Sequence, residues 1–237
     1  MNGPTSTPTP SRPDEVTRGG EVDRARARAA AYHVIAEILL PPGEELAGRL
    51  GDGSLAADLD IAARVLGLGP AAALGAEAAR RRGTGARALE QAHMDLFGPT
   101  VGTAHPPYST EYDPDAGFRK EQELADIAGY YKAWGVGIAD DLHERVDHFG
   151  VEADFLSFLA AKEAVALAAD GPVDLVREAA ARFACTYVLP AARLFDERLE
   201  RAQASPLFLH AAALLHALAE SSPEPARRRV VPLPVVS

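Results

Sequence analysis

The chain has 237 residues, of which 47% are hydrophobic and only 6% aromatic, and its formal net charge is −10 at pH 7. Alanine, the best helix former, occurs 47 times, so the composition favours an all-α protein. The negative charge excludes a broad basic surface for a nucleic-acid backbone or an anionic membrane. The single cysteine, Cys185, cannot form an intramolecular disulfide, which favours the reducing environment of the cytoplasm.

Hydrophobic periodicity, interrupted by proline and glycine, predicts a single all-α domain of about eight or nine helices over residues 21–220. The helices are expected at 22–40, 44–67 (one or two helices), 70–82, 86–97, 118–134, 147–169, 172–201 and 205–220. Pro190 should kink the helix over 172–201, and Ser205 should cap the last one. No apolar run reaches the length of about 18 residues that a membrane span needs, so stable membrane insertion is not expected.

Three segments are expected to lie outside the helices. Residues 1–20, rich in Pro, Thr, Ser and Gly, predict a disordered leader, and residues 98–114, with four prolines, predict a long internal loop. Residues 221–237 predict a flexible tail in which Arg227, Arg228 and Arg229 precede an apolar end. This basic-then-apolar order resembles a signal peptide in outline. An alternative is therefore a tail folded into a groove of its own or of a neighbouring molecule.

The excess negative charge is concentrated in the middle of the chain. Residues 111–178 contain 16 acidic and 6 basic residues, a difference of −10 that equals the net charge of the whole chain. The sequence has no nucleophile elbow, no Gly-x-x-x-x-Gly-Lys phosphate loop and no cysteine pair for zinc. Together these observations favour a binding module for a basic and apolar partner over an enzyme.

One spacing in the acidic region suggests a metal site as an alternative. Glu144, His148 and Glu152 are separated by four residues each, and a continuous helix would align them as a carboxylate–histidine face. Such a site needs further ligands on a second helix, and the sequence holds no second copy of the spacing. The other interpretation is that Asp147 caps a helix in which His148 occupies the first turn. We expect no metal and no cofactor.

Aromatic residues supply a second group of candidates. Tyr108, Glu111 and Tyr112 lie on the proline-stiffened loop, where they either offer contact area at low entropic cost or fold onto the core. In the predicted helix over 118–134, Trp134 shares the apolar face and is expected in the core. Tyr130 lies on a more polar face, and its ring is expected to be accessible.

Three blocks of sequence follow one another in a recognisable order. They are Pro-Pro-Tyr-Ser-Thr-Glu-Tyr at 106–112, Glu-Leu-Ala-Asp-Ile-Ala-Gly-Tyr-Tyr-Lys-Ala-Trp-Gly at 123–135, and Glu-x-x-Asp-His-x-x-x-Glu-x-Asp-Phe at 144–155. Together they resemble the TorD/DmsD/NarJ family of molybdoenzyme maturation chaperones, and the first block is similar to chaperones of type II DMSO-reductase-like enzymes. The third block is the most specific. It departs from the family pattern at Val146, where proline is common, and at Asp154, where glutamate is common.

The resemblance implies an all-helical, non-enzymatic chaperone of the cytoplasm, either a monomer or a homodimer. Its partner would be the catalytic subunit of a molybdoenzyme, whose twin-arginine signal peptide or N-terminus it holds until the cofactor is inserted and folding is complete. Under this hypothesis Asp147, Glu144 and Glu152 meet the arginines and His148 orients Asp147.

Aromatic rings would line the groove for the apolar part of the peptide. The full set of expected peptide-binding residues is Tyr108, Glu111, Tyr112, Tyr130, Trp134, Glu144, Asp147, His148 and Glu152. The alternatives are a carboxylate–histidine metal enzyme and a helical adaptor that docks a folded partner.

Overall fold

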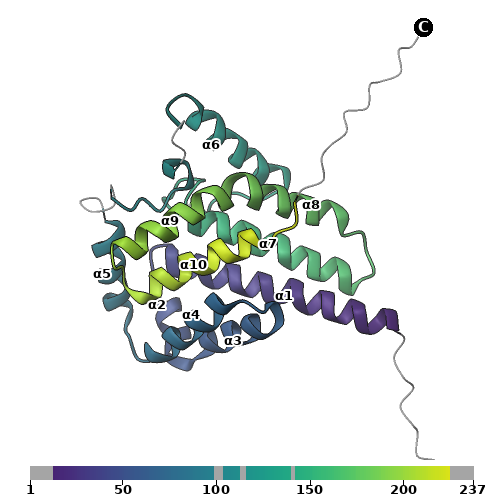
Figure 1. The fold of residues 1–237 in the computed structure, drawn as a ribbon, viewed down its shortest axis with the longest axis horizontal. Helices are drawn as coiled ribbons and strands as arrows, with labels where there is room; N and C mark the ends of the chain where they lie inside the picture. The colour runs from purple at the N-terminus through teal and green to yellow at the C-terminus, as the bar shows by residue number, and fades with distance from the viewer. Residues whose placement is uncertain (1–12, 99–103, 113–115, 140–141, 225–237) are drawn as a thin grey trace, which may run out of the picture.

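The computed structural model describes residues 13–98, 104–112, 116–139 and 142–224, and within these residues every element of regular secondary structure is a helix (Figure 1). The elements are α1 (Pro13–Leu39), α2 (Glu44–Asp52), α3 (Ser54–Leu66), α4 (Gly69–Arg80), α5 (Ala86–Phe97), the 3-10 helix η1 (Ser109–Tyr112), α6 (Ala116–Ala133), α7 (Phe149–Ala168), α8 (Asp174–Phe183), the π-helical segment η2 (Ala184–Val188), α9 (Leu189–Arg201) and α10 (Pro206–Glu220). Because α8, η2 and α9 run on without a break, the described residues form nine separate α-helical rods in one all-α domain. The predicted fold class and helix number are confirmed.

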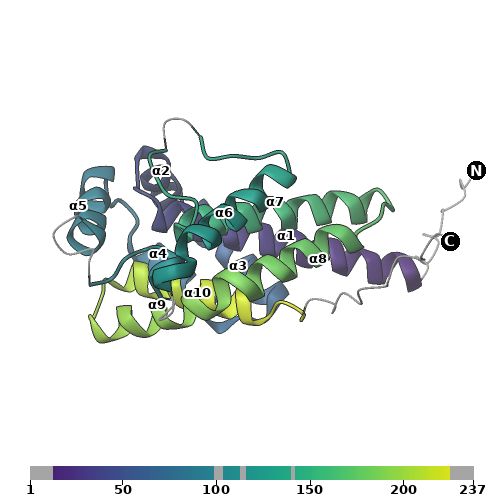
Figure 2. The same cartoon turned by 90° about the horizontal axis from the view of Figure 1, so that it is seen from above.

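The centre of the domain is the antiparallel pair α1 and α7, which lie side by side over most of their length (Figures 1 and 2). Gly150, at the start of α7, contacts Leu40 just beyond the end of α1. At the opposite end of the pair, Arg18 of α1 forms an ion pair at 2.9 Å with Asp170, which follows α7. Small alanines on both helices allow this close approach, and the larger side chains between them are fully buried.

The other helices cover this pair unequally. Helices α3, α4 and α10 pack on one side, and the α8–η2–α9 rod closes another. Helix α6 instead makes its main contacts with η1 and projects from the body (Figure 1). It is held by its buried side chains Ile127 and Tyr131, and the Tyr131 hydroxyl donates a hydrogen bond to the Val146 carbonyl at 2.8 Å. A further contact comes from Tyr130, whose ring packs against Phe183 and Tyr187.

Most predicted helix ends lie within a few residues of the observed ones, and three details differ. Helix α1 begins at Pro13, so the predicted leader is helical from there on, while residues 1–12 lie outside the described residues. Ser205 precedes α10 but makes no capping bond with its side chain, which instead accepts a hydrogen bond from Arg81 at 2.8 Å. His148, not Asp147, caps α7 through its ring.

The helix continues through Pro190 without a break. The preceding residues adopt a π turn, in which the Leu189 N–H reaches back five residues to the Ala184 carbonyl. Proline lacks an N–H and its ring clashes with the carbonyl four residues earlier in an α-helix. The wider π turn accommodates both features, so the rod continues through Pro190.

The predicted loop over 98–114 and the predicted tail over 221–237 are described only in part. Residues 104–112 of the loop are irregular apart from η1, as expected, while residues 99–103 and 113–114 lie outside the described part of the chain. Residues 225–237 of the tail also lie outside the described part of the chain. Among the described residues, no helix is both long and apolar enough to cross a lipid bilayer.

The contact between α7 and the end of α1 can be tested at Gly150. A methyl group at this position would lie 2.6 Å from Leu40 Cγ and 3.1 Å from the Leu40 backbone nitrogen. We expect Gly150→Ala to lower the free energy of unfolding by about 1–3 kcal/mol, because the backbone cannot yield without separating the two helices. Urea denaturation measures the change.

Gly48→Ala in α2 is the matched control, because nothing lies within 4 Å of a methyl group there. We expect this variant to be as stable as the wild type or more stable by up to about 1 kcal/mol. Equal stability of the two variants would contradict the close approach at Gly150.

Candidate functional site

The loop over 104–112 is attached to the start of α7 by a short stretch of backbone pairing. Tyr108 and His148 form an isolated antiparallel bridge. The Ser109 N–H donates to the Asp147 carbonyl at 2.8 Å, and the Phe149 N–H donates to the Pro107 carbonyl at 2.9 Å. This pairing brings together seven of the nine predicted site residues: Tyr108, Glu111, Tyr112, Glu144, Asp147, His148 and Glu152. We call this region the loop–α7 junction.

His148 has a structural position at the junction. Its Nδ1 atom accepts a hydrogen bond from the Gly150 N–H at 3.0 Å, which satisfies one of the free donors at the start of α7. Burial lowers the pKa of His148 to about 3, so the ring is neutral with its proton on Nε2. The ring packs edge-on against Tyr108, with centroids 5.3 Å apart.

Asp147 is fully buried, and the chain's own Arg145 already binds it. Arg145 Nε donates to Asp147 Oδ1 at 2.9 Å and Nη2 donates to Oδ2 at 2.6 Å, while the Thr110 hydroxyl donates to Oδ2 at 2.6 Å. The same guanidinium donates to Glu111 at 2.9 Å and lies 4.4 Å from the centroid of the Tyr108 ring. Arg145 therefore links the loop to the start of α7 in the bidentate manner typical of arginine–carboxylate pairs.

Glu152 is also fully buried, one turn into α7. The Ser109 hydroxyl donates to its Oε1 atom at 2.7 Å, and its Oε2 atom has no hydrogen-bond partner among the described residues. Burial raises the pKa of Glu152 well above its usual value, because a carboxylate without a cation is costly in a dry interior. Glu152 is thus an internal anchor for Ser109, in surroundings that favour its protonated form.

Only two carboxylates of the junction reach solvent. Glu144 is half-buried and accepts a hydrogen bond from the Tyr108 hydroxyl at 3.0 Å. Glu111 is one-third exposed and is bonded by Lys120 and Arg145, which lower its pKa. Tyr112 is buried against Phe149, and its hydroxyl donates to the Pro106 carbonyl at 3.0 Å. Tyr112 belongs to the core and does not line a groove.

Tyr130 and Trp134 lie away from this junction, on a groove of about 560 Å³ between α6 and α8. The floor includes the small residues Ala125, Gly129 and Ala133 of α6, and Leu175 and Tyr187 face them. We call this surface the α6/α8 groove. Trp134 is half-buried, which corrects the expectation of a core position, because α8 does not close over this end of α6.

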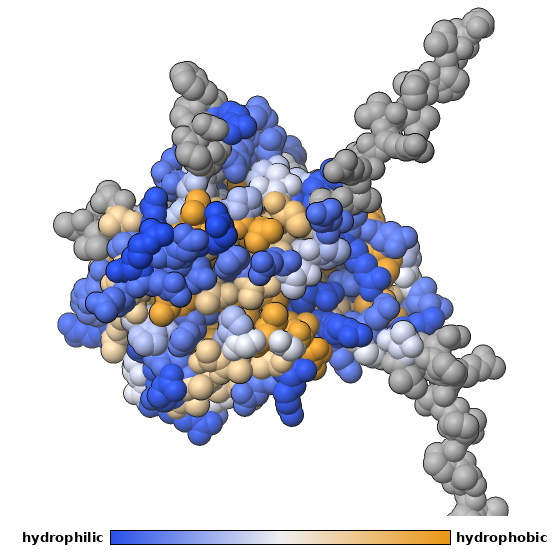
Figure 3. All heavy atoms as spheres, viewed as in Figure 1, coloured by the Kyte–Doolittle hydropathy of each residue, from blue (hydrophilic) through white to orange (hydrophobic). Residues whose placement is uncertain are grey.

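The α6/α8 groove continues into a second hollow of about 510 Å³, with Trp134 and Leu175 in both linings. Leu175 is 72% exposed and Val165, in the second hollow, is 69% exposed. In Figure 3, apolar side chains form separate areas on a mostly hydrophilic face. Exposed apolar side chains beside a groove are typical of a surface that binds a partner.

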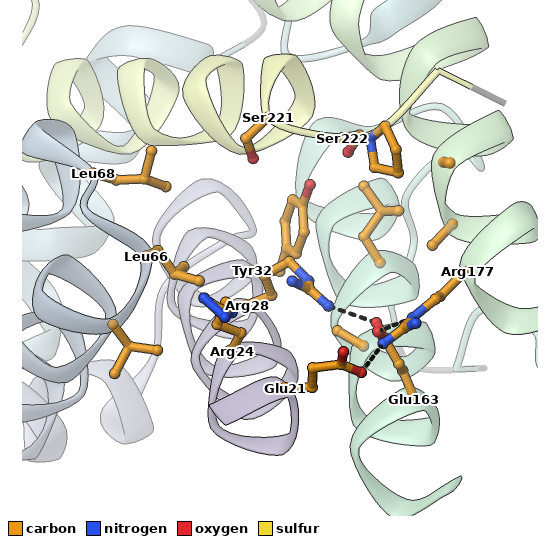
Figure 4. A pocket seen from close by; sticks show the side chains of 16 residues that line it. Glu21, Arg24, Arg28, Tyr32, Leu66, Leu68, Glu163, Arg177, Ser221 and Ser222 are labelled. Carbon is orange, nitrogen blue, oxygen red and sulfur yellow. Dashed lines mark hydrogen bonds and ion pairs between the residues drawn. The ribbon is translucent and has the colours of Figure 1, made fainter. Parts of the chain in front are cut away.

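A separate cavity of about 570 Å³ lies between α1, α7, α8 and the end of α10 (Figure 4). Arg28 and Arg177 each donate to Glu163 at 2.6 Å, and Arg177 also donates to Glu21 at 2.9 Å. Both oxygens of the buried Glu163 are thereby paired, and the network ties α1 to α7 and α8. The lining contains none of the predicted site residues, so we interpret this cluster as structural.

The helix alignment behind the metal alternative does not form. Helix α7 begins at Phe149, so Glu144 lies in the preceding loop and not on a helix face with His148 and Glu152. Within the described ranges, no group of three or more His, Cys, Asp or Glu side chains is arranged to hold a metal ion.

A family model described as nitrate reductase delta subunit matches residues 62–190, which is more than half of the chain. The chain belongs to the nitrate reductase delta subunit family. This is the family of NarJ/TorD-type molybdoenzyme chaperones, and membership supports a general role in molybdoenzyme maturation. A search of curated proteins finds no significant match. The matched residues include both the loop–α7 junction and the α6/α8 groove.

Within this family member, sequence reasoning missed Arg145 as part of the site. The available signal was a basic residue inside an acidic block, between Glu144 and Asp147. Sequence reasoning also missed Leu175 and Tyr187, which join Tyr130 and Trp134 on the groove. These two residues are more than 40 positions downstream, and only the fold brings α8 and η2 beside α6.

The pairing of Arg145 with Asp147 predicts a large stability loss on substitution. Arg145→Met leaves a fully buried carboxylate without its cation. We expect a loss of about 2–4 kcal/mol in the free energy of unfolding, below the full cost of breaking a buried pair because Arg145 is partly exposed. Chemical denaturation measures it. Lys120→Met, which removes the other cation bound to Glu111 but leaves no buried carboxylate unpaired, should change stability by less than about 1 kcal/mol.

The double variant Arg145→Met, Asp147→Asn completes a thermodynamic cycle. Since the second change removes the unpaired charge, we expect the double variant to be more stable than Arg145→Met alone. If the stability losses of the two substitutions simply added in the double variant, this would contradict a direct interaction between Arg145 and Asp147.

The raised pKa of Glu152 predicts a pH dependence with a definite sign. The folded state retains this proton at pH values where the unfolded chain, with a pKa near 4.5, has lost it. The stabilisation is complete below the unfolded pKa and is lost as the pH rises through the folded pKa. The stability of Glu152→Gln relative to the wild type should therefore increase from acidic to alkaline pH, as measured by thermal unfolding. A difference that is independent of pH would contradict burial of a protonated carboxyl.

Proposed function

We propose that the chain binds the twin-arginine signal peptide, or an equivalent N-terminal segment, of a molybdoenzyme catalytic subunit in the cytoplasm. It would hold this segment until the cofactor is inserted and the subunit has folded, and it would perform no catalytic step itself. The observation that carries the proposal is the α6/α8 groove, which has aromatic walls, acidic side chains at its edge and a position inside the family match.

The groove suits an apolar segment of the client. Small residues on the α6 side let a peptide backbone approach closely, while Tyr130, Trp134 and Tyr187 offer rings with a polar edge. The second hollow, which includes Phe158 and Val165, extends the apolar surface along the same direction. A helix or an extended strand of the client would bury these side chains on binding.

Exposed carboxylates suit the client's arginines. Asp126 and Glu178 line the groove, and Glu111 and Glu144 reach solvent at the loop–α7 junction. These groups can receive a guanidinium in charge-assisted hydrogen bonds.

The buried members of the predicted site take other roles in this proposal. Asp147, His148 and Glu152 are at most 1% exposed, so they hold the loop in place and do not contact the client directly. Tyr112 serves the same purpose from the core. Tyr108 is left to face the client, beside Glu144.

A titration with a synthetic twin-arginine signal peptide tests the proposal. Trp134 is the only tryptophan in the chain, so its emission reports directly on the groove. We expect a saturable spectral shift and weaker binding of a peptide whose two arginines are replaced by lysines, because lysine lacks the bidentate fork. Leu175→Glu should weaken binding by about tenfold or more, equivalent to about 1.4 kcal/mol.

Ile61→Glu is the matched control, since Ile61 is also an exposed hydrophobic residue but lies on α3. The affinity of Ile61→Glu for the peptide should equal that of the wild type. Glu144→Gln should have a smaller effect, about twofold to fivefold, as expected for an exposed ion pair. If Leu175→Glu binds the peptide as tightly as Ile61→Glu does, the groove is not the binding surface.

A further inference from the structure

The described part of the chain ends against η2, about one helical turn beyond the α6/α8 groove. The Pro223 carbonyl accepts a weak hydrogen bond from Cys185 Sγ in η2 at 3.8 Å, one residue before the last described residue, Glu224. Glu178, Arg182 and Cys185 are four and three residues apart along the α8–η2 rod, so they lie on one side of it. Glu178 and Arg182 both line the α6/α8 groove. Pro223 itself lines the separate cavity between α1, α7 and α8, so the chain leaves the body next to the groove, about one helical turn beyond Arg182.

The segment that follows has the composition that this groove favours. Residues 225–237 contain Arg227, Arg228 and Arg229, followed by five apolar side chains interleaved with Pro232 and Pro234. Prolines favour an extended chain, and thirteen residues span up to roughly 40 Å at about 3 Å each. The distance along the rod from Cys185 back to Glu178 is only about 10 Å. The segment is long enough to follow the whole groove.

The charges of the segment and the body are opposite. The whole chain carries −10 and the segment carries +3, so residues 1–224 carry −13. Asp126 lies on the α6 side of the groove and Glu178 on the α8 side. Glu178 accepts a hydrogen bond at 2.6 Å from Arg182 of the same lining, so the arginines of the segment would compete with Arg182 for it. Burial, and then the nearby charges of Asp126, Tyr130 and Glu123, raise the pKa of Tyr187 to about 12. Guanidinium groups would find carboxylates at the edge and aromatic faces within.

We propose that residues 225–237 bind in the α6/α8 groove of their own chain, with the arginines at its acidic edge and the valines and leucine against Trp134, Leu175 and Tyr187. Attachment beside the groove gives the segment a high effective concentration, on the order of millimolar, so even weak contacts would keep it bound. The segment would cover exposed apolar side chains when no client is present. Its competition with a client rests on the proposed function, whereas its binding to the groove does not.

Quenching of Trp134 fluorescence by acrylamide in the full-length chain tests the proposal without any client. In the variant Arg227→Gln, Arg228→Gln, Arg229→Gln the segment loses its charge. We expect the quenching constant to rise by roughly twofold, since a half-buried indole becomes accessible. Added salt should raise the quenching of the wild type toward that of the variant, because screening weakens contacts between exposed charges.

The matched control is Arg26→Gln, Arg87→Gln, Arg201→Gln, which changes the net charge equally at exposed positions outside the groove. Its Trp134 quenching constant should equal that of the wild type. On the groove side, Asp126→Asn with Glu178→Gln should reproduce the effect of the tail variant, and combining both sets should add nothing further.

Three results would overturn the proposal. The first is a quenching constant of the tail variant equal to that of the wild type. The second is a quenching constant of the control variant that rises as much as that of the tail variant. The third is quenching of the wild type that falls with increasing protein concentration, because this would assign the segment to a neighbouring molecule. If the proposed function also holds, the tail variant should bind the twin-arginine peptide several-fold more tightly than the wild type. If only that peptide experiment shows no tighter binding, the result counts against the proposed function, and the binding of the tail to the groove is unaffected.

Discussion

The binding of Asp147 by Arg145 is the interaction on which the loop–α7 junction depends. A fully buried carboxylate needs a cation and hydrogen-bond donors to remain charged, and Arg145 and Thr110 supply them from either side of the junction. The same arginine reaches Glu111 and covers the Tyr108 ring. One side chain thus holds a loop to a helix that lies more than 30 residues away in sequence.

This arrangement changes the meaning of the acidic motif. The motif contains four carboxylates and a histidine, yet only Glu144 and Asp154 of these reach solvent. Asp147 instead accepts a hydrogen bond from the Thr110 hydroxyl of the loop. His148 caps α7, and Glu152 accepts a hydrogen bond from the buried Ser109 hydroxyl. The motif therefore builds a rigid platform, and the exposed groups next to it supply the charge that a basic partner would meet.

The position of α6 is the second constraint. Because α6 is anchored mainly at Ile127 and Tyr131 and projects from the body, its small residues do not pack against α8, and a groove remains between the two helices. A fully packed α6 would gain stability but close this surface. An open groove with exposed apolar side chains carries a risk of unspecific association, and a segment of the same chain that covers it would reduce that risk.

The sequence by itself determined the helices and the family. Pro and Gly positions and helical periodicity placed α5 at 86–97 and the start of α10 at Pro206, because capping and backbone preferences act locally. The three sequence blocks predicted the family that the match over residues 62–190 confirmed. The exposure of each site residue was decided only by tertiary structure. Arg145 binds Asp147, and Trp134 packs against the core with one part of its surface and lines a groove with the other. Burial depends on which distant segments pack against a side chain, and this information is not contained in local spacing.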